Sequence, residues 1–150
     1  MVSTGYTNVG EEWAQKFIYR QDTLGTRDTT LEILLYDDST DSLSDSSDIG
    51  DVTTEPTSGN YARQTINLDS SDLSISLTNG DIRIQGTVTF DVTNTTESID
   101  AFGGVISFQS DVVNAEGSQN PHLIFTADIG TSNLSTFTGN FEVQVNIDLT

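Results

Sequence analysis

The chain has 150 residues, a length that predicts one domain spanning 1–150 and argues against a multi-domain enzyme with a separate cofactor module. Its 23 Asp and Glu against 5 Lys and Arg give a formal net charge of −18. This balance argues against nucleic acid or an anionic membrane surface as a partner, because both are bound through clustered cations. The absence of cysteine excludes disulfides, thiolate metal sites and thiol nucleophiles.

The charge also bears on the solvent in which the protein works. Leu, Ile, Val and Phe together exceed the roughly 20 % below which a highly charged chain is expected to be disordered, so we expect a folded protein. Lys16 is the only lysine, beside four arginines. At molar salt the Debye length falls to about 3 Å and the self-repulsion of such a surface is screened. The composition therefore favours a halophilic protein, with an acidic protein of a moderate environment as the alternative.

The first structural element predicted is a short N-terminal helix over residues 8–21. Thr7 or Asn8 can cap it, and acidic residues open the helix while basic residues close it, as the helix dipole favours. One face carries an apolar stripe made of Val9, Trp13 and Phe17. The stripe either covers an open end of the core or docks on a neighbouring subunit, and it is our candidate oligomer or docking surface. The start of the chain lacks the basic and apolar regions of a signal peptide, so we expect synthesis in the cytoplasm and no membrane insertion.

From residue 30 to residue 150 the hydrophobic period is two, which predicts an all-β fold. We expect an antiparallel β-sandwich or jelly roll of about seven to eight strands. The Asn79-Gly80 pair predicts a tight hairpin, and Gly86 marks a bend or bulge in the long strand that follows. The predicted strands cover residues 31–36, 61–68, 73–77, 82–92, 105–108, 123–125 and 141–149.

An acidic segment, residues 37–59, separates the first two predicted strands. It contains almost no apolar anchor, so we expect a long surface loop, solvated and in weak association with sodium or potassium. Its carboxylates do not follow the spacing of an EF-hand, and no dedicated metal site is predicted. They belong to Asp37, Asp38, Asp41, Asp45, Asp48, Asp51 and Glu55.

The sequence predicts no catalytic residues. His122 is the only histidine, without a nucleophile motif beside it or a second histidine to share a metal, so a structural or merely exposed role is expected. Glycine-rich phosphate loops and dinucleotide fingerprints are absent from the sequence, and we expect neither an enzyme nor a cofactor.

Three features of the chain, taken in this order, form a recognisable set. The first is Thr7-Asn8-Val9-Gly10-Glu11 leading into the helix. The second is the strand at residues 31–36 followed by an Asp-, Thr- and Gly-rich loop that closes on Ser58-Gly59-Asn60-Tyr61-Ala62-Arg63-Gln64. The third is the order of the later strands, residues 80–92, then 103–108 and 123–127. Together they resemble a group of small structural proteins of tailed viruses, the tail-fibre-like or head-decoration proteins of phages and of viruses of halophilic archaea. The segment 58–64 is similar to the group's GGYARQ segment but has Asn60 in place of a glycine.

This resemblance implies a non-enzymatic subunit of a virus particle, a capsid decoration, turret or tail fibre. Its partners would be copies of itself, as trimers or pentamers, other virion proteins and the host cell surface. In the second segment, Tyr61 is expected to pack its ring and Arg63 to pair with a carboxylate, a structural motif without catalytic duty.

A second hypothesis is a non-catalytic carbohydrate- or ligand-binding β-sandwich module, assisted by calcium through Asp45, Asp48 and Asp51. Such modules usually display exposed aromatic platforms, whereas the aromatics of this chain sit at strand parity or in the helix.

Overall fold

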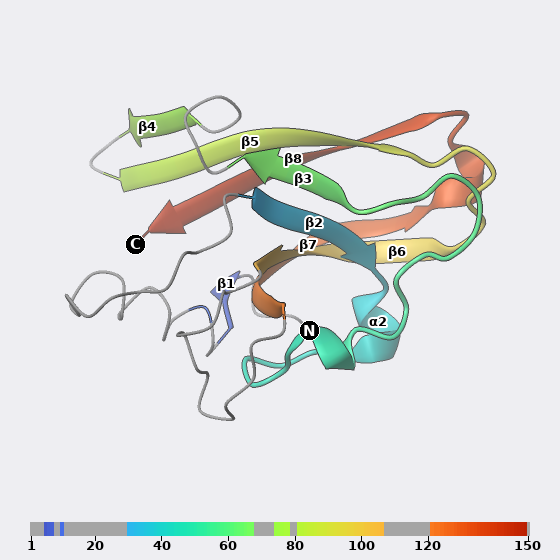
Figure 1. Cartoon of the computed structure of the whole chain (residues 1–150), viewed down its shortest axis with the longest axis horizontal. Helices are drawn as coiled ribbons and strands as arrows, with labels where there is room; N and C mark the ends of the chain where they lie inside the picture. The colour runs from blue at the N-terminus through green and yellow to red at the C-terminus, as the bar shows by residue number, and fades with distance from the viewer. Residues whose placement is uncertain are drawn as a thin grey trace.

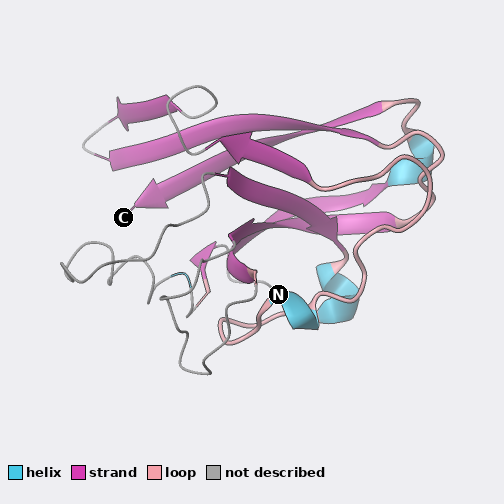
Figure 2. Ribbon diagram, in the orientation of Figure 1, coloured by secondary structure: helices cyan, strands magenta, loops and turns pink. Residues whose placement is uncertain are grey.

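A computed structural model of the chain describes residues 5–7, 10, 30–67, 74–78, 81–106 and 121–149. In these residues strands form two antiparallel sheets and helix is confined to short turns outside them, which confirms the predicted all-β class (Figures 1 and 2). One sheet has five strands in the order β1-β7-β6-β2-β3, and the other has three in the order β4-β5-β8. The strands are β1 (Gly5–Tyr6), β2 (Thr30–Tyr36), β3 (Gln64–Asn67), β4 (Ser74–Thr78), β5 (Asp81–Asp91), β6 (Ser98–Ile106), β7 (His122–Asn133) and β8 (Asn140–Leu149).

The clearest periodic segments form the strands that their patterns predict. β2, β5 and β8 lie within one residue of the predicted bounds, and β4 joins β5 through the predicted hairpin, in which Thr78 is paired with Asp81. The predicted bulge at Gly86 is wrong, because the register of β5 with β8 runs through this residue without a shift.

The strands β3, β6 and β7 differ from their predicted bounds. β6 begins at Ser98, earlier than predicted, and is buried along almost its whole length because it lies in the middle of the larger sheet. Its Ala101-Phe102-Gly103-Gly104 stretch lacks the alternation that reveals a half-exposed strand. β7 runs on to Asn133, and β3 begins only at Gln64, three residues after Tyr61.

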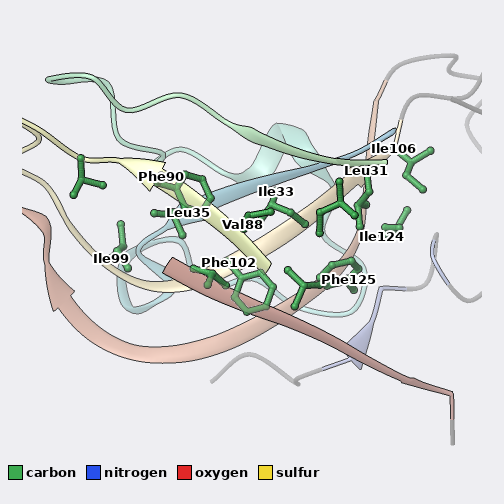
Figure 3. Packing of buried hydrophobic residues seen from close by; sticks show 14 of the residues in the cluster. Leu31, Ile33, Leu35, Val88, Phe90, Ile99, Phe102, Ile106, Ile124 and Phe125 are labelled. Carbon is green, nitrogen blue, oxygen red and sulfur yellow. The ribbon is translucent and has the colours of Figure 1, made fainter. Parts of the chain in front are cut away.

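A hydrophobic cluster joins the two sheets into one body (Figure 3). Alternate residues of β2 point into it, as do Val88 and Phe90 in the second half of β5, and Phe90 and Ile33 are fully buried. Residues of β3, β6, β7 and β8, with Val92 after β5 and Leu134 after β7, complete the core. Its buried members are Leu31, Ile33, Leu35, Ile66, Val88, Phe90, Val92, Ile99, Phe102, Ile106, Ile124, Phe125, Leu134, Val143 and Val145.

A bulge in β7 redirects its first residues. The register with β6 shifts between Gly104 and Val105, so Ile124 and Phe125 both point into the core while Leu123 lies on the opposite, outer face of the sheet. Gly104 has no room for a side chain, because a Cβ atom there would overlap the Phe125 ring. The bulge therefore depends on a glycine in the neighbouring strand.

A second hydrophobic cluster covers the outer face of the five-stranded sheet. It contains Tyr36, Val105 and Leu123 from the strands and Leu43 from the acidic segment, with Ile49 and Val52 packed against it. The prediction that the segment has almost no apolar anchor is therefore wrong. Three apolar residues, spaced irregularly among Asp, Ser and Thr, pack this segment against the sheet.

The predicted helix at residues 8–21, with Val9, Trp13 and Phe17, lies outside the described residues apart from Gly10. The start of the segment is held in place: Thr7 Oγ1 donates to the carbonyl of Leu123 at 2.7 Å and accepts from the Gly10 N–H at 3.2 Å. The latter is the bond that an N-cap side chain makes.

Candidate functional site

The segment from residue 37 to residue 63, which we call the strap, links β2 to β3 and crosses the outer face of the larger sheet. It includes the short helix α2 (Asp38–Asp41) and the turn η1 (Ile49–Asp51), which Figure 1 shows below the sheets. The strap carries all seven carboxylates of the acidic segment and both Tyr61 and Arg63. Of the described residues that the sequence named as candidates for a site, only His122 lies outside it.

Where the strap leaves β2, three carboxylates hold it through hydrogen bonds. Asp37 caps α2 by accepting hydrogen bonds from the Thr40 N–H and hydroxyl, and Asp38, which is buried, accepts from the Leu43 N–H at 3.0 Å. Asp100 of β6 accepts from the Asp38 N–H at 2.6 Å and from the Ser39 N–H at 3.2 Å. These carboxylates satisfy backbone donors that a helix of one turn leaves unpaired.

Asp41 closes the strap on itself. It accepts hydrogen bonds from the N–H and the hydroxyl of both Thr53 and Thr54, at distances from 2.6 to 3.2 Å. Burial favours the neutral acid, but the four hydrogen bonds to the ionised form outweigh it and lower the pKa of Asp41.

Asp48 joins the strap to the start of β7. One oxygen accepts from the Leu123 N–H at 2.9 Å and from the Ile49 N–H at 2.8 Å, and the other lies 2.6 Å from His122 Nδ1. The His122 side chain is only 2 % exposed. The single histidine is thus buried in a contact between strap and sheet, which fits the first of the two roles, structural or merely exposed, that the sequence predicted.

Tyr61, Arg63 and Glu55 form a junction at the end of the strap. Arg63 makes a two-pronged ion pair with Glu55, at 2.8 Å from Nε and 2.7 Å from Nη2, and reaches Glu32 of β2 at 3.2 Å. The Tyr61 hydroxyl donates to Glu55 at 3.1 Å and accepts from the Leu35 N–H at 3.0 Å. Hydrogen bonding to Glu55 raises the pKa of Arg63, while burial raises that of the Tyr61 phenol.

The Tyr61 ring connects this junction to the core. It stacks on Phe90, with ring centroids 5.8 Å apart and planes 7° from parallel. Two residues earlier, Gly59 takes a positive φ of 64° against the turn formed by residues 93–95. A Cβ atom at Gly59 would come closer than 3 Å to the backbone of that turn, so only glycine fits without displacing it.

Glu97 pins the same end of the strap from the other side. It accepts from the backbone N–H groups of Thr57 at 3.1 Å and Ser58 at 3.0 Å, and it also binds the Ser58 hydroxyl. Partial burial opposes ionisation, but these bonds and that of the Thr96 N–H dominate and lower the pKa of Glu97 to about 2.

The carboxylates of the strap do not converge on one point. Among the described residues there is no group of three or more His, Asp or Glu side chains that could hold a metal ion. Asp48 and Asp51 each accept a hydrogen bond from the other's backbone N–H, and the bond from the Asp48 N–H to the Asp51 carboxylate is 2.9 Å long. Asp45 is exposed. In the described structure Asp45, Asp48 and Asp51, the residues suggested for calcium, are therefore not gathered into such a group.

Sequence reasoning missed three of the pinning residues: Glu32, Glu97 and Asp100. Their partners are mostly backbone N–H groups, or side chains far away in the sequence, and such pairs leave no local pattern. One signal was available, because Asp48 and Asp51 have the spacing of a capping box and do form one around η1.

Comparison of the chain with family models, with curated proteins and with solved structures finds no match. Within the described part of the chain, no helix has the length and apolar character needed to cross a membrane.

Proposed function

We propose that the protein is a non-catalytic structural subunit of a virus particle, of the tail-fibre-like or head-decoration class that its sequence resembles. In this proposal the two sheets form a β-sandwich, copies of the chain assemble as trimers or pentamers, and the assembly docks on other proteins of the particle as a decoration, turret or fibre. The virus would infect a halophilic archaeon, and the acidic surface would face brine and the host cell.

The observation that carries this proposal is the role of the segment that resembles the viral group. Gly59, Tyr61 and Arg63 all serve to lock the strap to the sheets. The residues that carry the resemblance make structural contacts between the backbone and the core. Such contacts keep the fold rigid, which suits a protein that acts through its shape.

The state of the polar groups supports the same reading. Histidine is the residue type that most often serves as a general base, and the single histidine of this sequence, His122, is buried against Asp48. The carboxylates of Asp38, Asp41 and Asp48 accept short hydrogen bonds from N–H and hydroxyl donors. Bonds of this length persist at molar salt, where longer-range charge interactions are screened.

Light scattering after size exclusion tests the proposal directly, in molar salt and again after dialysis to low salt. We expect a discrete trimer, pentamer or hexamer of the 16.2 kDa chain in molar salt that dissociates or unfolds in low salt. A stable monomer in both buffers would contradict both the self-assembly and the adaptation to salt.

The docking role of Val9, Trp13 and Phe17 has its own test. Trp13→Ala is expected to lower the assembled mass or the melting temperature in high salt. Phe137→Ala is the matched control, because Phe137 is the exposed large apolar side chain of the described residues, at 37 %. If both variants keep the mass and melting temperature of the parent, the stripe is not a docking surface.

A further inference from the structure

The four sheet edges of the described structure differ sharply in length. The five-stranded sheet ends at β1, of two residues, and β3, of four, and the three-stranded sheet ends on one side at β4, of five. Its other edge is β8, of ten residues, which among the described strands is paired only with β5. Very short edge strands are a common protection against unwanted strand pairing, so the edges at β1 and β3 are protected in this way, whereas β8 is the longest edge.

β8 lacks several of the other devices that protect an edge, although it carries the charged residues Glu142 and Asp148. It contains no proline and no lysine, and its register with β5 is continuous from Asn140 to Leu149 without a bulge. Val143 and Val145 are buried against the core, so the strand is held firmly from below, whereas Glu142, Gln144 and Asn146 are exposed on the outer face. A long, regular and firmly held edge is a template for one more strand.

We propose that the β8 edge is a self-association surface, on which β8 of a second copy of this chain adds in antiparallel orientation about a two-fold axis at Gln144. The inference deepens the self-assembly part of the proposed function, on which it rests. Because the contact is two-fold, it adds to the contacts that would close a trimer or pentamer and does not replace them.

The register follows from the faces and charges of the strand. Buried residues must lie opposite buried residues, so the axis must pass through a residue and not between two. An axis at Gln144 places Val143 opposite Val145 and Glu142 opposite Asn146. An axis at Val145 would place Glu142 opposite Asp148, and like charges directly opposite are destabilising. An axis at Val143 brings no like charges together but pairs only residues 140–146, whereas the axis at Gln144 pairs residues 140–148.

The charge of the chain sets the conditions for this contact. Two copies that each carry −18 repel one another at low salt, while the backbone hydrogen bonds of an added strand act only at contact. Strand addition is therefore expected in molar salt and is expected to weaken as salt is removed.

A single cysteine tests the register cleanly, because the natural chain has none. In Gln144→Cys the two thiols lie directly opposite across the axis, within the reach of a disulfide. The matched control is Thr87→Cys, on the neighbouring strand β5, exposed on the same face and paired with Gln144 within one chain. Two copies of residue 87 would be separated by three inter-strand spacings of about 4.8 Å each, too far for a disulfide.

Under mild oxidation in molar salt, we expect most of the Gln144→Cys protein to run as a covalent dimer on a non-reducing gel and Thr87→Cys to remain uncrosslinked. Hydrogen exchange of the unmodified chain gives a second readout. We expect alternate β8 amides, those pointing away from β5, to exchange at least tenfold more slowly in the assembled than in the dissociated protein.

The outcomes separate this inference from the proposed function. An oligomer by light scattering in which Gln144→Cys is folded but not crosslinked would overturn the β8 contact and leave self-assembly standing. If Gln144→Cys does not fold, fast exchange of alternate β8 amides in the assembled natural chain would overturn it equally. A monomer under all conditions would overturn both.

Discussion

The two faces of the five-stranded sheet are covered in different ways. The inner face meets the three-stranded sheet through a continuous apolar core, whereas the outer face is covered by the strap, which contributes Leu43, Ile49 and Val52 and is otherwise polar. On the inner face, burial of apolar surface holds the two sheets together, and this force is non-directional. On the outer face, carboxylates that accept hydrogen bonds from individual backbone groups fix the position of the strap. The second solution needs little apolar sequence, but it needs ionised acids.

The largest effect is expected from a cavity on the inner side. Phe90→Ala removes a fully buried ring that also stacks on Tyr61, and such truncations cost about 3–5 kcal/mol. Denaturant unfolding in molar salt measures it. Phe137→Ala, at an exposed ring in edge contact with Phe141, should cost about 1 kcal/mol or less. Equal losses would show that the inner core is not the main source of stability.

Gly59→Ala tests the point where the strap meets the turn at residues 93–95. The positive φ alone costs an alanine about 1–2 kcal/mol, and the close backbone of the turn must also move, so we expect a loss of at least about 2 kcal/mol. Gly50→Ala is the control, because nothing lies within 4 Å of a Cβ atom there and its φ is not positive. Thermal unfolding of the two variants should differ clearly, and similar melting temperatures would contradict the tight fit at Gly59.

Asp48→Ala tests the carboxylate pins themselves. It removes the acceptor for the Leu123 and Ile49 N–H groups and the partner of a buried histidine, so we expect a loss of about 1–3 kcal/mol. Asp45→Ala removes the same charge from an exposed position of the strap and should leave the free energy of unfolding unchanged within about 0.5 kcal/mol. If the two variants unfold alike, the hydrogen bonds of Asp48 do not help to hold the strap on the sheet.

The smallest expected effect is a dependence on acid pH that the inner core should not share. The pKa of Glu97 is about 2 in the folded chain, against an ordinary value of 4.5, so its bonds stabilise the fold fully above about pH 4.5 and are lost as the pH falls towards 2. For an acid so open to solvent, we expect a contribution of about 1 kcal/mol. Glu97→Gln should therefore be less stable at neutral pH and show a flatter loss of stability in acid. An unchanged pH profile would contradict the role of Glu97.

The same contrast explains how far the sequence could be read. The alternation of residues 141–149 and the Asn79-Gly80 pair specify β8 and the β4–β5 hairpin locally, because side-chain period and turn chemistry are properties of neighbouring residues. The position of the strap on the sheet could not be predicted from the sequence in this way. Asp48 and Leu123 are 75 residues apart, and the donor is a backbone N–H that every residue except proline carries.

The bounds of β6 and β7 could not be predicted from the sequence for a related reason. A strand buried on both faces, such as β6, loses the alternation by which a half-exposed strand is recognised. The bulge at Ile124 lies opposite Gly104, and only the paired strands together show that this glycine makes room for the Phe125 ring.

The use of backbone donors in the strap has a consequence for sequence drift. Thr57 is held to Glu97 through its main-chain N–H, and its own side chain is exposed, so this bond is indifferent to which amino acid stands at position 57. The same bond forbids proline there, because proline has no N–H to donate. The outward surface of the strap is thereby free to diversify under selection from whatever it meets, while a small set of acids and glycines preserves its path over the sheet.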